Sequence, residues 1–560
     1  MEWTGQAAKG LARRVLQAGF LTGIVLWAAT GLAGGKAGNV VVLIADGCGG
    51  EQYTFARWFK GRPLSMDHIR VGAVRTFIAD SVVADSAPAA SAYATGVRTS
   101  DNFISVGPHE KTISGVPVPA EDLRYKPLAT VLEGAKLVGK AVGVVSTSRV
   151  THATPAAFYA HVPARDLEND IMEQLVYQNM DVVLGGGNRH LLPANEKGRR
   201  SDNENLARVL EEKGYRVIHT REELLRIQSG KVFGMFADSH MSPEIDRPQI
   251  GPDQPSLDQM TRKAIELLSL DPDGFFLMVE GSQIDWACHA NDPAYLLSDL
   301  LAYDKAVQAA LDFAKKDGNT LVLALSDHNT GGFSIGNEKT GATYSQMKTE
   351  DLLDPIRKMK TSSMGLWKMV EKNETPRGVR DAVKKGWGMD ISPEEAERIL
   401  SLANRYNAYE SPHYAFGEVL CPAYTVVGWT THGHTGGDVP LHAFGPGQPA
   451  GVVDAPQIAR ICAGAMGFDL TDVDRRLFVE SGKAFADAKI VANRDDDQNP
   501  VAVLDYQGKH YAFPVNKNLM KSDGKETELK GVVVYSAETG KIYIPKDAVD
   551  QIKKESGKQN

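Results

Sequence analysis

The sequence predicts an α/β protein whose mostly parallel central β-sheet is covered by helices on both faces. Short runs of β-branched residues alternate with longer helical patterns along most of the chain. The chain has 560 residues, of which 42% are hydrophobic and 24% charged, so it can bury a large core and has the composition of a globular protein. Several of the strand-like runs end in polar residues, and ligands bind beyond the carboxyl ends of parallel strands.

The first 36 residues have the order of a secretory signal peptide. Lys9, Arg13 and Arg14 precede an apolar stretch at about 15–32, which small residues follow. We expect cleavage near Ala33 and therefore a periplasmic or secreted protein. The apolar stretch approaches the length of a membrane span, so an uncleaved N-terminal membrane anchor is the alternative.

The elements of the main domain, residues 37–484, follow from the apolar periodicity. The predicted core strands are 39–45, 71–78, 141–146, 275–279 and 320–326. The predicted helices between them are 127–136, 167–178, 256–268 and 293–316.

Two segments break this alternation. Residues of about 341–414 contain charged helical patterns such as 393–406, which predicts a cap or crown-like insertion in the main domain. Strand-like runs resume at 423–428 and 439–444. From residue 485 to 560 the composition changes again, and two β-like units at 501–514 and 531–545 predict a small β-rich C-terminal appendage.

Charge and cysteine content narrow the possible functions. The net charge of −8 offers no basic patch, so we expect no specific nucleic acid recognition. The four cysteines could form up to two disulfides, with three possible pairings, or could be packing residues. They lack a Cys-x-x-Cys spacing, which gives a thiolate zinc site little support. These cysteines are Cys48, Cys288, Cys421 and Cys462.

Two of the strand ends could carry reaction chemistry. Asp46 and Gly47 end the run 40–45, where a carboxylate could meet a metal or phosphate, although Asp-Gly after a strand is also an ordinary turn. Ser86 begins an alanine-rich helical segment, and a serine there is often only a helix cap. The same position places the hydroxyl where a helix favours anions.

Metal-ligand residues gather at three further places. An aspartate and a histidine four residues apart can reach one ion across a helical turn, and mixed nitrogen and oxygen ligands suit Zn²⁺ with a nearby Mg²⁺. The three clusters are Glu280, Asp285 and His289; Asp327 and His328; and His432 and His434.

Taken in this order, the segments resemble the alkaline phosphatase family from about residue 39 to 447. The most specific elements are Asp85-Ser86-Ala87, the Thr95-Gly96-Val97 that closes the helix, the run from Glu280 to His289, Asp327-His328 and His434-Thr435-Gly436. The resemblance implies an alkaline-phosphatase-like fold and a homodimer without a transmembrane partner. It also implies hydrolysis of small phosphate monoesters to an alcohol and phosphate through a phosphoserine.

The resemblance also implies a role for each matched residue. Ser86 would be the nucleophile and Arg165 would clamp the phosphate. Two zinc ions would be held, one by Asp46, Asp327 and His328 and the other by Asp285, His289 and His434. A third site, usually occupied by Mg²⁺, would be formed by Asp46, Glu280 and Thr154.

The chain departs from one branch of the family at two positions. His152 stands where some members have aspartate, and Trp286 stands where they have lysine. Both could support the third site indirectly, and Co²⁺ is an alternative to Mg²⁺ there. His432 could compete with His434 as a ligand, and the Thr-Gly after His434 favours His434.

Three other functions are alternatives to this one. A sulfatase would need arginine where Ala90 stands. A phosphodiesterase would keep the metal ligands, but Arg165 suits a phosphoryl group with two free terminal oxygens. A non-catalytic metal or phosphate binder would not need both the nucleophile and all the ligands.

Overall fold

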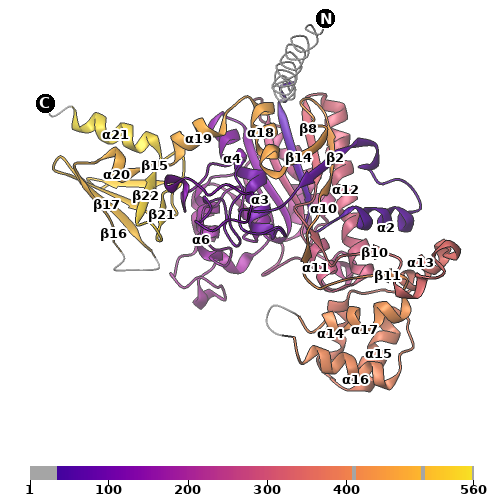
Figure 1. Cartoon of the computed structure of the whole chain (residues 1–560). Helices are drawn as coiled ribbons and strands as arrows, with labels where there is room; N and C mark the ends of the chain where they lie inside the picture. Colours follow the sequence, from indigo (N-terminus) through magenta and orange to yellow (C-terminus); the bar gives the residue numbers. More distant parts are fainter. Residues whose placement is uncertain (1–34, 407–410, 494–498, 558–560) are drawn as a thin grey trace, which may run out of the picture.

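The computed structural model describes residues 35–406, 411–493 and 499–557. The predicted signal peptide, except for its last two residues, therefore lies outside the described residues. Within the described part of the chain, no helix combines the length and apolar character needed to cross a membrane. A ten-stranded sheet forms the centre of the molecule (Figure 1), with the strand order β14-β2-β13-β8-β1-β7-β3-β4-β6-β5.

The middle of this sheet is fully buried. β1 (Asn39–Ala45) runs parallel to both of its neighbours, β7 (Phe275–Gly281) and β8 (Thr320–Leu325), and every residue of the three strands is buried. Continuous apolar runs of this kind are typical of parallel strands that are covered on both faces.

The remaining strands extend the sheet on both sides. On one side lie β3 (Ala141–Arg149), β4 (Val182–Gly186), β6 (Val232–Met235) and β5 (Arg216–Ile218), all parallel. On the other side β13 (Val439–Phe444) is antiparallel to β8 and to β2 (Arg70–Arg75), and β14 (Gly451–Asp454) pairs with β2 in parallel. The predicted mostly parallel sheet is therefore confirmed.

Alternate residues of β1 enter two separate cores. Val41, Leu43 and Ala45 pack with helices α10 (Leu257–Leu268) and α12 (Pro293–Asp317). Val40, Val42 and Ile44 pack on the other face with α3 (Ser86–Thr95), α4 (Val131–Leu137) and α18 (Ala455–Met466). Helices thus cover both faces of the sheet, as the sequence predicts.

The segment after β8 is a helical insertion, drawn in orange below the sheet in Figure 1. It contains α13 (Thr349–Arg357), α14 (Ser363–Val370), α15 (Pro376–Trp387), α16 (Pro393–Ala403) and α17 (Tyr414–Tyr424). The predicted strand 423–428 is wrong in its first half, because α17 continues to Tyr424 and only Val427–Gly428 form a strand, β11. Phe416 and Leu420 are fully buried on one side of α17. The packing of this helix outweighs the strand-like pattern at the start of 423–428.

The C-terminal residues form two small sheets and a helix. One sheet contains β16 (Lys489–Asn493), β17 (Val501–Tyr506), β18 (Lys509–Pro514), β19 (Leu519–Ser522) and β20 (Lys525–Glu528). The other contains β15 (Val479–Glu480), β22 (Lys541–Ile544) and β21 (Val534–Ser536). The sequence did not predict the helix α21 (Lys546–Ser556). Lys517 joins this region to the main sheet domain by ion pairs to Glu173, 3.2 Å away, and to Glu204.

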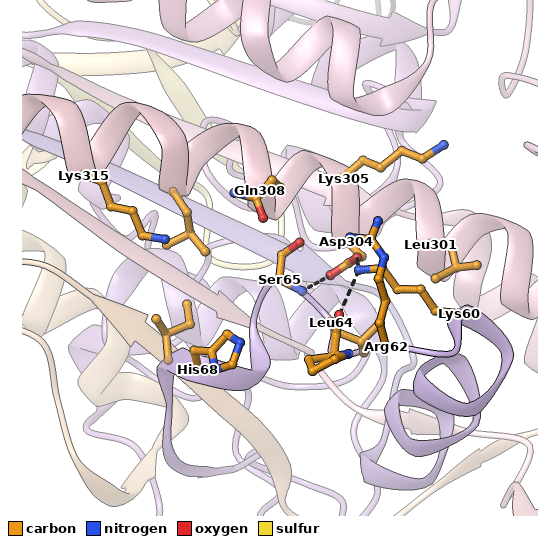
Figure 2. Close-up of a pocket in the computed structure, with 13 residues that line it drawn as sticks. Lys60, Arg62, Leu64, Ser65, His68, Leu301, Asp304, Lys305, Gln308 and Lys315 are labelled. Carbon is orange, nitrogen blue, oxygen red and sulfur yellow. Dashed lines mark hydrogen bonds and ion pairs between the residues drawn. The ribbon is translucent and has the colours of Figure 1, made fainter.

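A groove of about 680 Å³ lies between α12 and the segment that joins α2 (Gly50–Lys60) to β2 (Figure 2). In this groove Asp304 accepts hydrogen bonds from Lys60 and from the backbone of Ser65. None of the residues that line the groove is a predicted site residue.

Candidate active site

The predicted ligands come together because their strands are neighbours in the sheet. Ala45 of β1 pairs with Gly281 of β7, and Ile44 pairs with Leu325 of β8. The three parallel strands therefore end side by side. Asp46, Glu280 and Asp327 follow or occupy these ends, and all three side chains are fully buried.

Gly47 is required by the close packing at this edge. Its φ is +69°, and a Cβ atom there would lie 2.5 Å from Asp285 Oδ1. Its backbone N–H donates a 3.1 Å hydrogen bond to Asp327 Oδ1. A larger residue would both strain the backbone and displace Asp285.

Ser86 is the first residue of α3, and Asp85 is the residue that caps this helix. The Ser86 hydroxyl lies 3.1 Å from His328 Nε2 and 3.4 Å from Asp46 Oδ1. Only 2% of Ser86 is exposed. The serine hydroxyl thus lies at a helix N-terminus, where the backbone favours anions, and beside two of the predicted metal ligands.

The structure forms three groups of ligand atoms, each with its atoms within 4.8 Å of one another. The groups are Asp46, Asp327 and His328; Asp285, His289 and His434; and Asp46, His152 and Glu280. The first two are the sets that the family resemblance implies for two zinc ions. In the third group, a ligand atom of His152 lies with those of Asp46 and Glu280. His152 could therefore bind the ion of the third site itself, instead of only supporting the site indirectly.

Several buried atoms at these groups have no hydrogen-bond partner among the residues that the structure describes. They are Asp46 Oδ2, Asp327 Oδ2, Glu280 Oε1, Thr154 Oγ1 and His152 Nδ1. A buried polar atom without a partner costs about 1–3 kcal/mol, and more when it is charged. Bound cations would satisfy these oxygen and nitrogen atoms, so the residues present fit metal ions.

The crowding of buried carboxylates supports the same conclusion. Burial raises the pKa of Asp46 well above its usual value, and the nearby Asp327 and Asp285 add to this effect. Burial likewise raises the pKa of Asp327 and that of Glu280 to about 7 each. Divalent cations would reverse this effect, because they stabilise the ionised carboxylates.

In the second group, the aspartate and the two histidines face one another. Asp285 Oδ2 lies 3.2 Å from His289 Nε2, and the two Nε2 atoms of His289 and His434 are 3.1 Å apart. His434 Nδ1 is directed to the backbone oxygen of Ala84 at 3.0 Å, which leaves Nε2 for a ligand. His432 is not in this group, and its Nδ1 lies 2.6 Å from the backbone oxygen of His289.

Arg165 lies between the serine helix and the third group. It donates a 2.5 Å hydrogen bond to Asp85, and its Nη2 is 3.1 Å from His152 Nε2. Asp85 and the guanidinium stabilise each other, so the pKa of Asp85 is lowered and that of Arg165 raised despite their burial. Trp286 contacts the other side of His152, with ring centroids 5.5 Å apart.

Sequence reasoning missed several residues that hold these ligands in place. Thr330 donates a 2.5 Å hydrogen bond to Asp285. Ser146 donates one of 2.6 Å to Glu280 Oε2 and lies 2.9 Å from Ser282. The position of Ser146 at a predicted strand end was an available signal.

All four cysteines are free and buried. Cys288 Sγ accepts a 3.8 Å hydrogen bond from the Gln52 side chain, and Cys421 Sγ lies 3.1 Å from the backbone oxygen of Asn291. The structure therefore favours their role as packing residues over the disulfide alternative.

A family model for alkaline phosphatase matches residues 37–467. The chain belongs to the alkaline phosphatase family. Alkaline phosphatase 3 of Bacillus subtilis is 35% identical over 460 residues, which cover 78% of this chain and 90% of that protein. The crystal structure of Thermus thermophilus alkaline phosphatase superposes with a TM-score of 0.70 at 30% identity, covering 78% of this chain and 93% of that one.

A variant of the TAB5 alkaline phosphatase, described with Mg bound in its M3 site, is 26% identical and has a TM-score of 0.54. It covers 78% of this chain and 99% of that one. As a member of the alkaline phosphatase family, the chain is a phosphatase enzyme, and the family is metal-dependent. The structure adds three groups of residues that could bind its metal ions.

Proposed function

We propose that this enzyme hydrolyses phosphate monoesters through a covalent phosphoserine on Ser86, with two zinc ions and one magnesium ion bound. One observation supports this most directly. The Ser86 hydroxyl lies at the N-terminus of α3, 3.1 Å from His328 and 3.4 Å from Asp46, which belong to the first ligand group. A serine there can receive a phosphoryl group that the surrounding cations and backbone amides stabilise.

Substrate binding is assigned to Arg165 and the start of α3. A planar guanidinium can donate two parallel hydrogen bonds to phosphoryl oxygens. The ion pair with Asp85 holds Arg165 beside the serine before substrate arrives. This arrangement favours a monoester over a diester, because a monoester leaves two terminal oxygens for Arg165 besides the one that faces the α3 amides.

The reaction then proceeds in two displacements at phosphorus. The Ser86 oxygen forms a bond to phosphorus while the bond to the ester oxygen breaks, and the alcohol leaves with a proton. Water next attacks the phosphoserine, the bond to Ser86 breaks, and inorganic phosphate leaves as the hydroxyl regains its proton. When bound, the metal ions lower the pKa of the hydroxyl and of water and stabilise charge on the entering and leaving oxygens.

The proposed zinc ligands are Asp46, Asp327 and His328 at one site and Asp285, His289 and His434 at the other. For the third site we propose Mg²⁺ held by Asp46, Glu280 and Thr154, whose side chain is fully buried. A histidine-to-aspartate variant of the TAB5 alkaline phosphatase is described with Mg bound in its M3 site, which supports Mg²⁺ as one occupant, and Co²⁺ is the alternative because a His152 nitrogen belongs to the same group.

We also propose the location and assembly state of the enzyme. We expect a homodimer that acts on small phosphate monoesters in the periplasm or outside the cell after removal of residues 1–36. We expect no specific nucleic acid recognition.

An assay with an aryl phosphate monoester at pH 7 and pH 10 tests the proposal. Turnover should rise toward pH 10, disappear with a chelator and return when Zn²⁺ and Mg²⁺ are restored. Ser86→Ala should lower kcat by at least about a thousandfold, since alanine has no oxygen that could form the phosphoserine. Metal-loaded protein that cleaves a diester but no monoester would support the phosphodiesterase alternative, and a Ser86→Ala protein with unchanged turnover would exclude the serine mechanism.

A further inference from the structure

The helical insertion reaches the second ligand group through α17. The Tyr414 ring stacks on His432, with centroids 5.5 Å apart and planes inclined by 8°. The same ring is parallel to His289, at 6.4 Å and 2°. One aromatic side chain of the insertion therefore contacts both a proposed zinc ligand and the histidine beside it.

His432 and His289 are joined by two reciprocal hydrogen bonds. His289 Nδ1 donates to the backbone oxygen of His432, and His432 Nδ1 donates to the backbone oxygen of His289 at 2.6 Å. A carbonyl oxygen only accepts, so His289 carries its proton on Nδ1. Its Nε2 is thereby left facing Asp285 and His434, at 3.2 Å and 3.1 Å.

A carboxylate of α17 lies beside His432 Nε2, the ring nitrogen that does not face His289. Glu418 Oε2 lies 3.5 Å from His432 Nε2 and accepts a 2.5 Å hydrogen bond from the Tyr406 hydroxyl. About a third of the Glu418 side chain is exposed, at 34%, so water also reaches it. His432 is thus fixed on one side by His289 and on the other by the insertion.

The insertion is also packed directly against the end of the helix that carries His289. This helix, α11 (Gln283–His289), is followed by Ala290, and a Cβ atom at Gly417 of α17 would lie 2.0 Å from the Ala290 backbone oxygen. Asn291 donates a 3.0 Å hydrogen bond to the backbone oxygen of Thr431, just before His432. The positions of α17 and of His289 are therefore coupled.

From these contacts we infer that the helical insertion orients His289 for metal binding, with Tyr414, Glu418 and His432 as positioning residues. They act through His289, and we assign them no direct role on the phosphoryl group or on Ser86. The inference rests on the proposed zinc role of His289. Partners that orient a metal-ligating histidine commonly contribute tenfold to a hundredfold to metal affinity.

Zinc retention measures this role without depending on turnover. Purified zinc-loaded protein is titrated with a chelator of known affinity, and the zinc remaining per chain is counted. We expect Glu418→Ala and Tyr414→Ala to lower the affinity for one of the two zinc ions by about tenfold or more. Glu397→Ala, an exposed glutamate on α16 of the same insertion, is the matched control and should retain zinc like the parent protein.

Tyr414→Phe keeps the stacked ring and should retain zinc better than Tyr414→Ala, provided that thermal melts show both to be folded. The inference is overturned if folded Glu418→Ala and Tyr414→Ala both retain zinc like the Glu397→Ala control. Parallel monoester assays on the parent protein separate the two proposals. An inactive parent whose zinc retention falls with these substitutions would contradict the proposed function alone, and a parent that binds no zinc would contradict both.

Discussion

At the scale of single residues, Glu280 shows how the fold prepares a ligand. Its Oε2 accepts hydrogen bonds from Ser146 at 2.6 Å and from Ser148 at 3.3 Å. Its Oε1 is buried and has no hydrogen-bond partner within the described part of the chain. The serines therefore hold one oxygen and leave the other directed to Asp46 and His152, with which Glu280 forms the third group.

We predict that Ser146→Ala weakens magnesium binding about tenfold, because Glu280 loses its shortest hydrogen bond and its carboxylate can rotate. Calorimetric titration of the zinc-loaded, magnesium-free protein with Mg²⁺ measures the affinity directly. Ser269→Ala is a suitable control, because that exposed hydroxyl donates only to the backbone of Glu266. Equal affinities in the two variants would show that the serine does not position Glu280.

Ligand residues at strand ends can be predicted from the sequence, because the apolar runs next to them identify the strands. Asp46, Glu280 and Asp327 belong to this class. The sequence could not predict Thr330 or Glu418, since each contacts a residue remote in the sequence and neither lies in a recognisable pattern. The placement of His152 within ligand distance of Asp46 and Glu280 likewise depends on strand order, which periodicity does not determine.

At the scale of elements, local pattern predicted the buried strands best. The bounds of β1 and β13 agree with the predicted 39–45 and 439–444, because long apolar runs leave little choice of conformation. The short β4 and the amphipathic α21 were missed, although α21 buries Ala548, Val549 and Ile552 on one face. The predicted β-like unit 531–545 ends where α21 begins, and the helical spacing after it was not recognised.

The contact between α17 and α11 gives a test at this scale. Gly417→Ala should destabilise the protein by about 1–3 kcal/mol, because the new methyl group would overlap the backbone of Ala290. Gly464→Ala in α18 is the matched substitution. Beyond its own turn of the helix, no atom of the described residues lies within 4 Å of a Cβ there, so the substitution should be neutral or stabilise by up to about 1 kcal/mol. Chemical unfolding of both variants without metal ions measures the difference, and equal stabilities would contradict the packing argument.

At the scale of the whole molecule, burial of neutral histidines outside the metal groups links stability to pH. Burial lowers the pKa of His413 to about 3 and the pKa values of His190 and His442 to about 4. An unfolded histidine has a pKa near 6.5, so the unfolded chain binds more protons than the folded one below that pH. The contribution of these neutral histidines to the free energy of unfolding is complete above about pH 6.5 and is lost as the pH falls toward 4.

We therefore predict that His413 lowers the free energy of unfolding by about 2 kcal/mol at pH 5, and that the difference between the parent protein and His413→Gln isolates this loss from the opposite effect of Asp327 and Glu280, whose raised pKa values favour the folded state as the pH falls. Urea unfolding of chelator-treated protein at pH 7.5 and pH 5 measures this loss without a contribution from metal release. His413→Gln should show a smaller loss than the parent, because glutamine takes up no proton. His68→Gln removes an exposed histidine and should keep the parental loss. The same pH dependence in both variants would show that the burial of His413 does not control acid stability.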